Sequence, residues 1–296
     1  MHLNCSVFDC HCDTLTVRNL FHTKSHLNIR GMKKYRRYIQ VFAICAEKSH
    51  AYTYSEHYIK RFERMLRLWN MEKITDKASL KGATYGAILS LEGANAIDNL
   101  ASLEHFYNKG VRLVTLTWNN TNSIASSIMA EEDGGLSDFG KEVIKKCEDL
   151  GIVVDLSHIS DKSFFDVCDI TQKPFVCSHS NSRAINSNIR NITDTQFKEI
   201  VKRGGCVGIN FYHEFLDSPP SLSNIISHIE HFCALGGEKC IGIGSDFDGI
   251  DRMPDGCRGP EFIYDLSNEL LRLNYKEELV NDMLFNNFFQ IFLRTL

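Results

Sequence analysis

The sequence contains no apolar run of the about 18 consecutive residues that a transmembrane helix needs. Its N-terminal stretch, MHLNCSVFDC, has neither a basic segment nor a long apolar segment, so no secretory signal is expected. Charge of one sign is also scarce: the formal net charge is −4, and the one dense basic run, residues 33–37, is short. Binding to nucleic acid or to an anionic membrane therefore has little electrostatic support.

No C-x-x-C pair occurs, which removes the usual signature of a zinc knuckle. The eleven cysteines are an odd number, and several lie inside apolar runs, as at Cys45, Cys177, Cys206 and Cys240. Cysteine in such a setting behaves as a small buried hydrophobe. Together with the missing signal, this predicts free thiols in a reducing, cytoplasmic compartment.

Linkers, low-complexity tracts and short repeats are absent as well, so we expect one domain over residues 1–296. Eight short β-rich runs recur along it. They are continuous rather than alternating, which is typical of parallel strands buried on both faces. The runs are Ser6–Asp9 and residues 38–46, 86–93, 111–118, 151–158, 174–180, 206–212 and 240–248.

Helical patterns separate these runs. Ser137 is a predicted N-cap with Gly151 closing that helix, and Thr193 with Gln196 has the spacing of a capping box before a helix that ends near residue 204. This alternation predicts a (β/α)₈ barrel. Further helices are predicted at residues 56–74, 223–235 and 261–273, a long segment joins the first two strands at 13–37, and a C-terminal helical appendage is predicted at 276–294.

Polar residues gather where the predicted strands end, and a barrel brings those ends to one mouth. They are His11, Asp13, Glu92, Trp118, His158, His179 and Asp246. Side chains two residues apart on an extended strand point the same way, so His11 and Asp13 can share one ion. Glu92 has two oxygens and can bridge to a second ion held by His158 and His179, as in two-metal hydrolysis.

Each of these residues also has an ordinary structural interpretation. A single histidine at a strand end is more often a hydrogen-bonded structural residue, Asp13 can cap a turn, and Glu92 can be a solvated loop acid. Trp118 can be a core aromatic. Asp246 follows a glycine-rich stretch that allows close packing, which makes a buried role more plausible for it than for Asp248. The joint occurrence of these residues at corresponding strand ends favours the metal site.

The motifs resemble those of the membrane dipeptidase (renal dipeptidase) family of zinc peptidases. The segment DCHCDT is similar to the family's D-G-H-N-D, and SLEG to its E-G motif. The stretch GLSDFGKEVIKKCEDLGIVVDLSHIS resembles its helix–strand unit ending in D-L-[AS]-H. FVCSHSNSR, RNITDTQFKEIVKRGGCVGINFY and GIGSDFDG match further blocks in the same order, from residue 9 to about residue 250.

The resemblance implies an amidohydrolase-like barrel that hydrolyses dipeptides with water activated between two zinc ions. By matching position, His11 and Asp13 would bind one zinc, His158 and His179 the other, and Glu92 would bridge. Asp246 would be the acid/base residue, and Arg190 would hold the substrate carboxylate. A homodimer is implied by the family alone. One position departs: Trp118 stands where well-known members have a substrate-contacting histidine, so Trp118 becomes a candidate substrate-binding residue.

Two alternatives stay open. Another amidohydrolase-type enzyme acting on a non-peptide amide would use the same barrel, but such enzymes usually carry H-x-H after the first strand and a bridging lysine after the fourth. The first predicted strand here ends in His-Cys-Asp, and the fourth has no lysine at its end. A barrel that binds metal without catalysis is the second alternative, although no ligand of the predicted set is missing.

Overall fold

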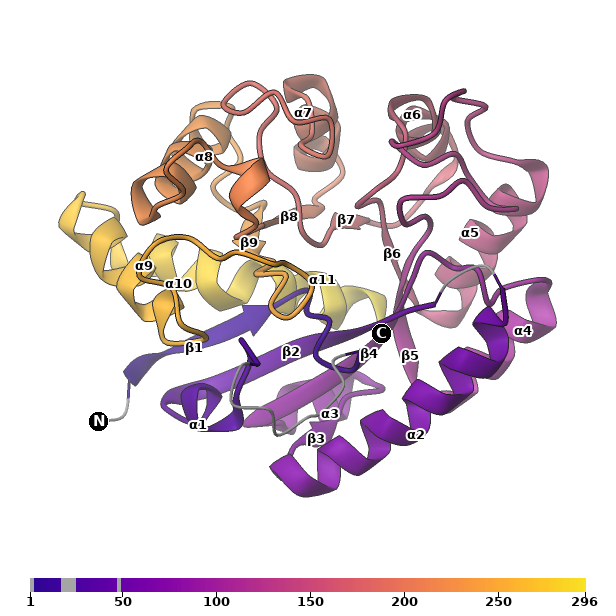
Figure 1. Cartoon of the computed structure of the whole chain (residues 1–296), viewed down its shortest axis with the longest axis horizontal. Coiled ribbons are helices and arrows are strands. Elements are labelled where there is room, and N and C mark those ends of the chain that lie inside the picture. Colours follow the sequence, from indigo (N-terminus) through magenta and orange to yellow (C-terminus); the bar gives the residue numbers. More distant parts are fainter. Residues whose placement is uncertain (1–2, 17–24, 47–48) are drawn as a thin grey trace.

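Eight parallel strands close into a barrel in the computed structural model, which describes residues 3–16, 25–46 and 49–296. The order β2–β1–β9–β8–β7–β6–β5–β4 is closed by pairing of β4 with β2, and each strand matches a predicted run (Figure 1). The (β/α)₈ prediction is therefore confirmed. The strands are β1 Leu3–Asp9, β2 Tyr35–Cys45, β4 Tyr85–Glu92, β5 Val111–Thr115, β6 Val153–Asp155, β7 Val176–Cys177, β8 Cys206–Ile209 and β9 Ile241–Ile243.

Most strands end earlier than predicted, so most of the predicted polar residues lie after the strand ends. The run 151–158 contains only Val153–Asp155 as a strand, and 240–248 only Ile241–Ile243. Beyond these ends, His158 and Asp246 have φ angles of 67° and 61°, in the left-handed region that a strand does not adopt. These residues therefore lie in loops beyond the strand ends.

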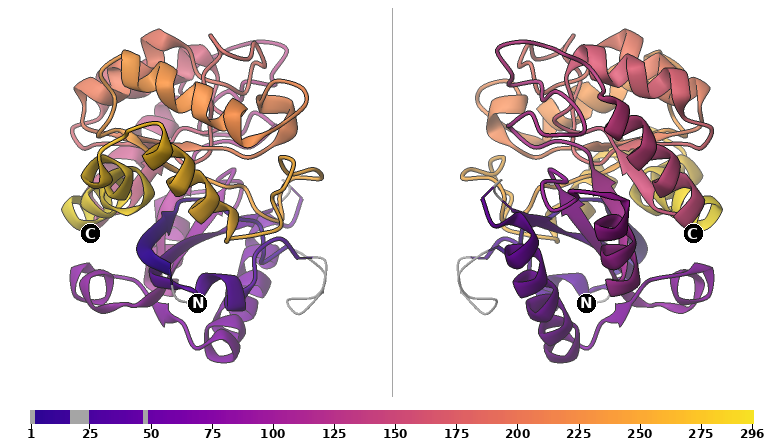
Figure 2. Two further views of the ribbon diagram at one scale, coloured as in Figure 1. Left: turned by 90° about the vertical axis from the view of Figure 1, so that its left-hand side faces the viewer. Right: turned by 90° about the vertical axis from the view of Figure 1, so that its right-hand side faces the viewer.

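Helices lie around the outside of the strands (Figure 2). The predicted caps are confirmed: Ser137 accepts from the Gly140 amide, and the hydroxyl of Thr193 accepts from the Gln196 amide in a capping box. No helix among the described residues is long and apolar enough to cross a bilayer. The helices are α1 Ile29–Met32, α2 Ala51–Trp69, α3 Lys77–Gly82, α4 Leu100–Lys109, α5 Asp138–Leu150, α6 Asp161–Ile170, α7 Asp194–Lys202, α8 Leu222–Ala234 and α9 Phe262–Arg272.

The predicted helix 56–74 is wrong at both ends. Helix α2 begins at Ala51 and stops at Trp69, because Asn70 adopts a left-handed φ of 51°. Residues Glu72–Lys73 form a two-residue strand, β3, on the edge of β4. Part of the long segment after the first strand, residues 17–24, lies outside the described residues.

The C-terminal segment is helical as predicted, but it packs against the barrel rather than standing apart. It comprises α10 Glu277–Asn281, a π-helical turn at Asp282–Asn286 and α11 Asn287–Thr295. Phe288 and Phe292 lie 5.9 and 5.1 Å from the ring of Phe8 on β1. They belong to one buried cluster with residues from seven of the strands: Phe8, Ile39, Val41, Ile88, Leu113, Val153, Val176 and Cys206.

Candidate functional site

The chain leaving β1 carries the first two predicted ligands. The Cys12 amide donates to Val41 O at 3.1 Å and the Asp13 amide to Phe247 O at 2.9 Å, so the chain stays extended between its neighbours after the strand ends. His11 Nε2 and Asp13 Oδ2 consequently meet at 3.3 Å, as their two-residue spacing predicts.

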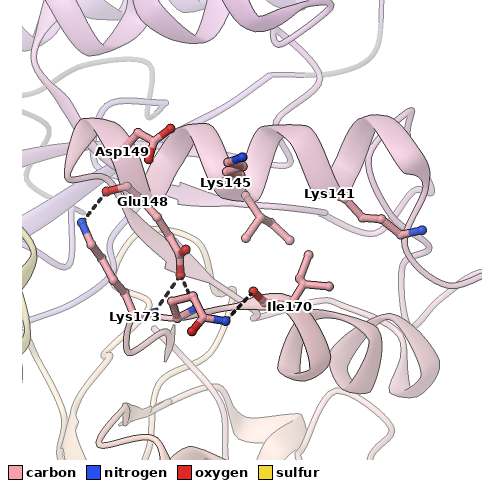
Figure 3. Close-up of a pocket in the computed structure, with 8 residues that line it drawn as sticks. Lys141, Lys145, Glu148, Asp149, Ile170 and Lys173 are labelled. Carbon is pink, nitrogen blue, oxygen red and sulfur yellow. Dashed lines mark hydrogen bonds between the residues drawn. The ribbon is translucent and has the colours of Figure 1, made fainter.

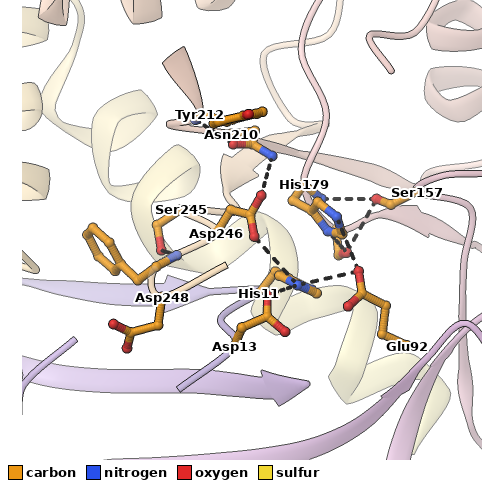
Figure 4. Close-up of polar contacts among 12 residues, drawn as sticks. His11, Asp13, Glu92, Ser157, His179, Asn210, Tyr212, Ser245, Asp246 and Asp248 are labelled. Atoms are coloured by element: carbon orange, nitrogen blue, oxygen red, sulfur yellow. Dashed lines mark hydrogen bonds and ion pairs between the residues drawn. The ribbon is translucent and has the colours of Figure 1, made fainter. Parts of the chain in front are cut away.

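Three histidines converge on one oxygen of Glu92 at the end of β4. The Oε1 atom of Glu92 lies 3.7 Å from His11 Nε2, 3.2 Å from His158 Nε2 and 3.6 Å from His179 Nε2. The Nε2 atoms of His158 and His179 are only 3.0 Å apart. All four side chains are buried, and His11, Glu92 and His179 point toward one another in Figure 4.

A buried carboxylate behind the site orients His179. Asp155 accepts hydrogen bonds from the Ser178 hydroxyl and amide, at 2.6 and 2.8 Å, and from the hydroxyl of Thr115 at 2.6 Å. The Ser178 oxygen lies 2.8 Å from His179 Nδ1. Gly208 on β8 and Gly244 after β9 make room for this segment, because a Cβ at either position would collide with the Ser178 carbonyl.

Asp246 lies beside His11 on the opposite side from Glu92. Its Oδ1 is 3.8 Å from His11 Nε2, and its Oδ2 accepts a hydrogen bond from the side-chain Nδ2 of Asn210 at 3.0 Å. Gly249 permits this approach, since a Cβ there would collide with the carboxylates of Asp13 and Asp246. One carboxylate oxygen is thus anchored while the other faces the histidine.

The electrostatics of the cluster favour a bound cation. Burial raises the pKa of Glu92 to about 8, with Asp13 and Asp246 adding to the effect against the influence of His11. Burial alone would lower the pKa of His11, but Glu92, Asp13 and Asp246 raise it to about 10. The carboxylates of Glu92, Asp13 and Asp246 are thus packed closely together away from water, where a nearby positive charge stabilises them.

The other two histidines present neutral nitrogens. Burial, with the charges of His11 and Arg190, lowers the pKa of His158 and His179 well below the ordinary value. Neutral imidazole is the form that binds a metal. Among the described residues, two sets of three residues could hold an ion, and within each set the donor atoms lie within 4.8 Å of one another. The sets are His11–Glu92–His179 and His11–Asp13–Asp246. This set of nitrogen and carboxylate donors fits zinc or a similar divalent ion.

Arg190 lies on the loop between β7 and α7 and is almost fully buried. Its guanidinium lies 5.3 Å from the centre of the Phe215 ring, and its Nε and Nη2 have no hydrogen-bond partner among the residues that the structure describes. Arg183, on the same loop, is instead paired with both oxygens of Asp161, at 2.8 and 3.0 Å. A buried cation without an anion is costly, so Arg190 is suited to receive one from outside the chain.

Trp118 follows β5 and is half-buried. Its ring centre lies 6.4 Å from that of His158, and a Cβ built at Gly93, next to Glu92, would lie 3.1 Å from the Trp118 Cβ. The indole therefore borders the histidine–carboxylate cluster, as a wall of the barrel mouth would.

Three polar residues near the site were missed from the sequence. Asn119 contacts His158, Asn210 contacts Asp246, and Tyr212 lies above Asn210 in Figure 4. Their only signal is proximity to predicted strand ends, in TWNN and INFY. Asp248 proves structural: its carboxylate points away from the histidines and accepts from the hydroxyl of Thr14 at 2.6 Å and the amide of His26 at 2.6 Å.

A hollow of about 730 Å³ lies on the outside of the barrel, between α5 and the end of α6 (Figure 3). Its lining mixes lysines and acids, and several are already paired: Lys141 with Asp138 at 2.8 Å, and Glu148 with the amides of Gln172 and Lys173 at 2.8 Å. None of the predicted site residues borders it.

The sequence profile of the family described as "Membrane dipeptidase (Peptidase family M19)" matches residues 1–295. The chain belongs to this family. It is 33% identical, over 217 residues, to an uncharacterized dipeptidase of Schizosaccharomyces pombe, covering 70% of this chain and 52% of that protein. The chain thus spans about half the length of this relative.

Several solved structures have a similar fold. A metallopeptidase named dipeptidase AC superposes with a TM-score of 0.88 at 25% identity, covering 99% of both chains. A Rhodobacter sphaeroides metallopeptidase, solved with a phosphinate mimic of the dipeptide L-Ala-D-Ala, gives 0.88 at 23% identity, covering 99% of this chain and 100% of that one. A dihydroorotase from Campylobacter jejuni, at 14% identity, has a TM-score of 0.54 over 97% of this chain and 82% of that one.

Proposed function

We propose that this M19 chain is a metal-dependent dipeptidase that hydrolyses the peptide bond of dipeptides. One observation carries the proposal: a single oxygen of Glu92 lies within 3.7 Å of three histidine Nε2 atoms, and one of these, on His11, also faces two further carboxylates. Membership of a dipeptidase family supports the substrate class.

Two zinc ions are the proposed cofactor. His11 and Asp13 would hold one, His158 and His179 the other, and Glu92 would bridge them. When bound, such ions polarise a carbonyl oxygen and lower the pKa of a water molecule between them. The carboxylates of Glu92 and Asp13 supply negative charge to balance the cations.

Asp246 is the proposed proton carrier. Asn210 holds its Oδ2 at 3.0 Å, which leaves Oδ1 facing the cluster. That oxygen would accept a proton from the attacking water and deliver it to the leaving nitrogen. An amine is a poor leaving group without this proton, so the same residue would serve both halves of the reaction.

Arg190 is the proposed binding residue for the C-terminal carboxylate of the substrate. Its unpaired Nε and Nη2 match the two oxygens of a carboxylate, a geometry that guanidinium favours. A cation at a set distance from the metal ligands would restrict the substrate to two residues, because a longer peptide places its carboxylate elsewhere.

The function is tested with a panel of dipeptides, tripeptides and non-peptide amides on metal-replete protein, read by the amino acids released. We expect hydrolysis of dipeptides and little hydrolysis of tripeptides. A chelator should abolish turnover, and added zinc should restore it. Turnover of a non-peptide amide alone would instead support the other amidohydrolase-type activity, and no turnover with full metal loading would support a non-catalytic barrel.

Metal content gives a separate prediction. Protein purified with added zinc should contain two zinc ions per chain by mass spectrometry, because five suitable ligands, His11, Asp13, Glu92, His158 and His179, lie close together. His179→Ala should lower this content, whereas an exposed control, His57→Ala on α2, should leave it unchanged. A zinc content near zero in fully active protein would contradict the metal-dependent mechanism.

Trp118→His should change the ranking of dipeptide substrates more than it changes stability. The indole is bulky and only donates a hydrogen bond, whereas imidazole is smaller and also accepts one. The ranking is measured as kcat/KM over the panel, and stability as the melting temperature. An unchanged ranking with a sharply lower melting temperature would show that Trp118 is a packing residue.

The homodimer, the cytoplasmic location and the single domain over residues 1–296 remain predictions.

A further inference from the structure

The Nδ1 atoms of His158 and His179 have different partners. His179 Nδ1 lies 2.8 Å from the Ser178 hydroxyl, which donates its hydrogen to Asp155 at 2.6 Å. The serine oxygen can therefore only accept from His179 Nδ1–H. The lone pair of His179 is therefore on Nε2, which faces Glu92. The buried carboxylate of Asp155 fixes this arrangement.

Within the described part of the chain, the Nδ1 atom of His158 has one partner, a neutral side chain on the surface. It lies 2.9 Å from Oδ1 of Asn119, an exposed residue on the loop that follows β5. Among the described residues, no carboxylate backs this amide in the way Asp155 backs Ser178. The tautomer of His158 therefore depends on the amide oxygen of one side chain.

The loop that carries Asn119 is bonded to the backbone of His158 as well. The Ile128 amide donates to His158 O at 2.8 Å, and the Ser127 hydroxyl donates to Trp118 O at 2.6 Å. The first bond attaches the end of residues 118–128 to the segment where His158 adopts its left-handed φ of 67°, and the second closes the loop on itself by tying Ser127 to Trp118. Asn119 is thereby held in register with the ring that it contacts.

We propose that Asn119 is a positioning residue that fixes the Nδ1–H tautomer of His158 and directs its Nε2 lone pair to the metal; the inference rests on the proposed role of His158 as a ligand. A neutral imidazole has one N–H and one acceptor nitrogen. An acceptor at Nδ1 selects the form in which Nε2 is free, and acceptors placed behind ligand histidines typically change metal affinity by about 10- to 100-fold.

The same loop also carries Trp118, the proposed substrate wall, one residue before Asn119. Changes in this loop that alter substrate preference should therefore also alter metal retention when they displace the Asn119 amide. Sequence comparison based on the ligands alone would miss this dependence.

The test compares zinc affinity of full-length variants, measured by competition with a chromophoric chelator. Asn119→Leu has a similar shape and no acceptor, and Asn119→Asp keeps an acceptor at the same place. Asn119→Leu should weaken one of the two zinc ions by about 10- to 100-fold, and Asn119→Asp should bind zinc at least as tightly as the parent. Asn120→Leu, at the exposed neighbouring position, is the matched control and should match the parent.

Asn119→Ala, which lacks the acceptor without adding an apolar side chain, should reproduce the loss seen with leucine; melting temperatures check that all variants fold. Parent-like zinc affinity in the leucine and alanine variants would overturn the inference, and so would an equal loss in Asn119→Asp. A parent protein that binds no zinc would overturn the proposed function itself, an outcome distinct from loss confined to the Asn119 variants.

Discussion

Asp246→Asn is expected to lower kcat on dipeptides by about 10²- to 10⁴-fold with the zinc content unchanged. The asparagine keeps the shape of the side chain and can still accept the hydrogen bond from Asn210, now 3.0 Å from Oδ2. Its amide group, facing His11 in place of Oδ1, cannot take up the proton of an attacking water. Steady-state kinetics and metal analysis on the same preparation measure the two quantities.

Asp248→Asn is the matched control, two residues further along the same loop. Asp248 holds Thr14, Ser25 and the His26 amide, so its substitution should lower the melting temperature more than kcat. The proton-carrier role of Asp246 would be contradicted if its asparagine variant kept near-parental kcat, above all if Asp248→Asn lost it instead.

Arg190→Ala is expected to lower kcat/KM on a free dipeptide by about 10- to 150-fold, because hydrogen bonds to charged groups contribute about 1.5–3 kcal/mol. The guanidinium is buried with Nε and Nη2 unpaired, so a substrate carboxylate would complete its hydrogen bonding. A dipeptide amide lacks the charge and should already be a poor substrate of the parent, so the same substitution should cost little on it.

Arg190→Lys separates charge from geometry. Lysine keeps the positive charge but cannot form two parallel hydrogen bonds to a carboxylate, so it should recover only part of the loss. Melting temperatures distinguish a folding effect, since alanine leaves the Phe215 ring without its cation. Equal losses on the dipeptide and its amide would show that Arg190 supports the loop and does not bind the carboxylate.

The amino-acid sequence by itself predicted the barrel and which histidines and carboxylates lie together at its mouth. Parallel strands buried on both faces require continuous apolar runs, and each of the eight runs overlaps one strand. Caps such as Ser137 and Thr193 are local, since the side chain binds an amide three residues away. The motifs placed His11, Glu92 and the other predicted ligands at strand ends, which closure of the barrel brings together.

Only the tertiary structure decided the geometry around those ligands. That one oxygen of Glu92 faces three histidines depends on the stagger of strands far apart in the chain. Asn119 reaches the ring of His158 from the loop after β5, and Asp155 on β6 holds the Ser178 hydroxyl beside His179; the sequence does not show that these distant segments meet. The C-terminal helices likewise proved part of the core. The sequence did not predict this, because an apolar helical stripe indicates burial but not the surface against which the helix packs.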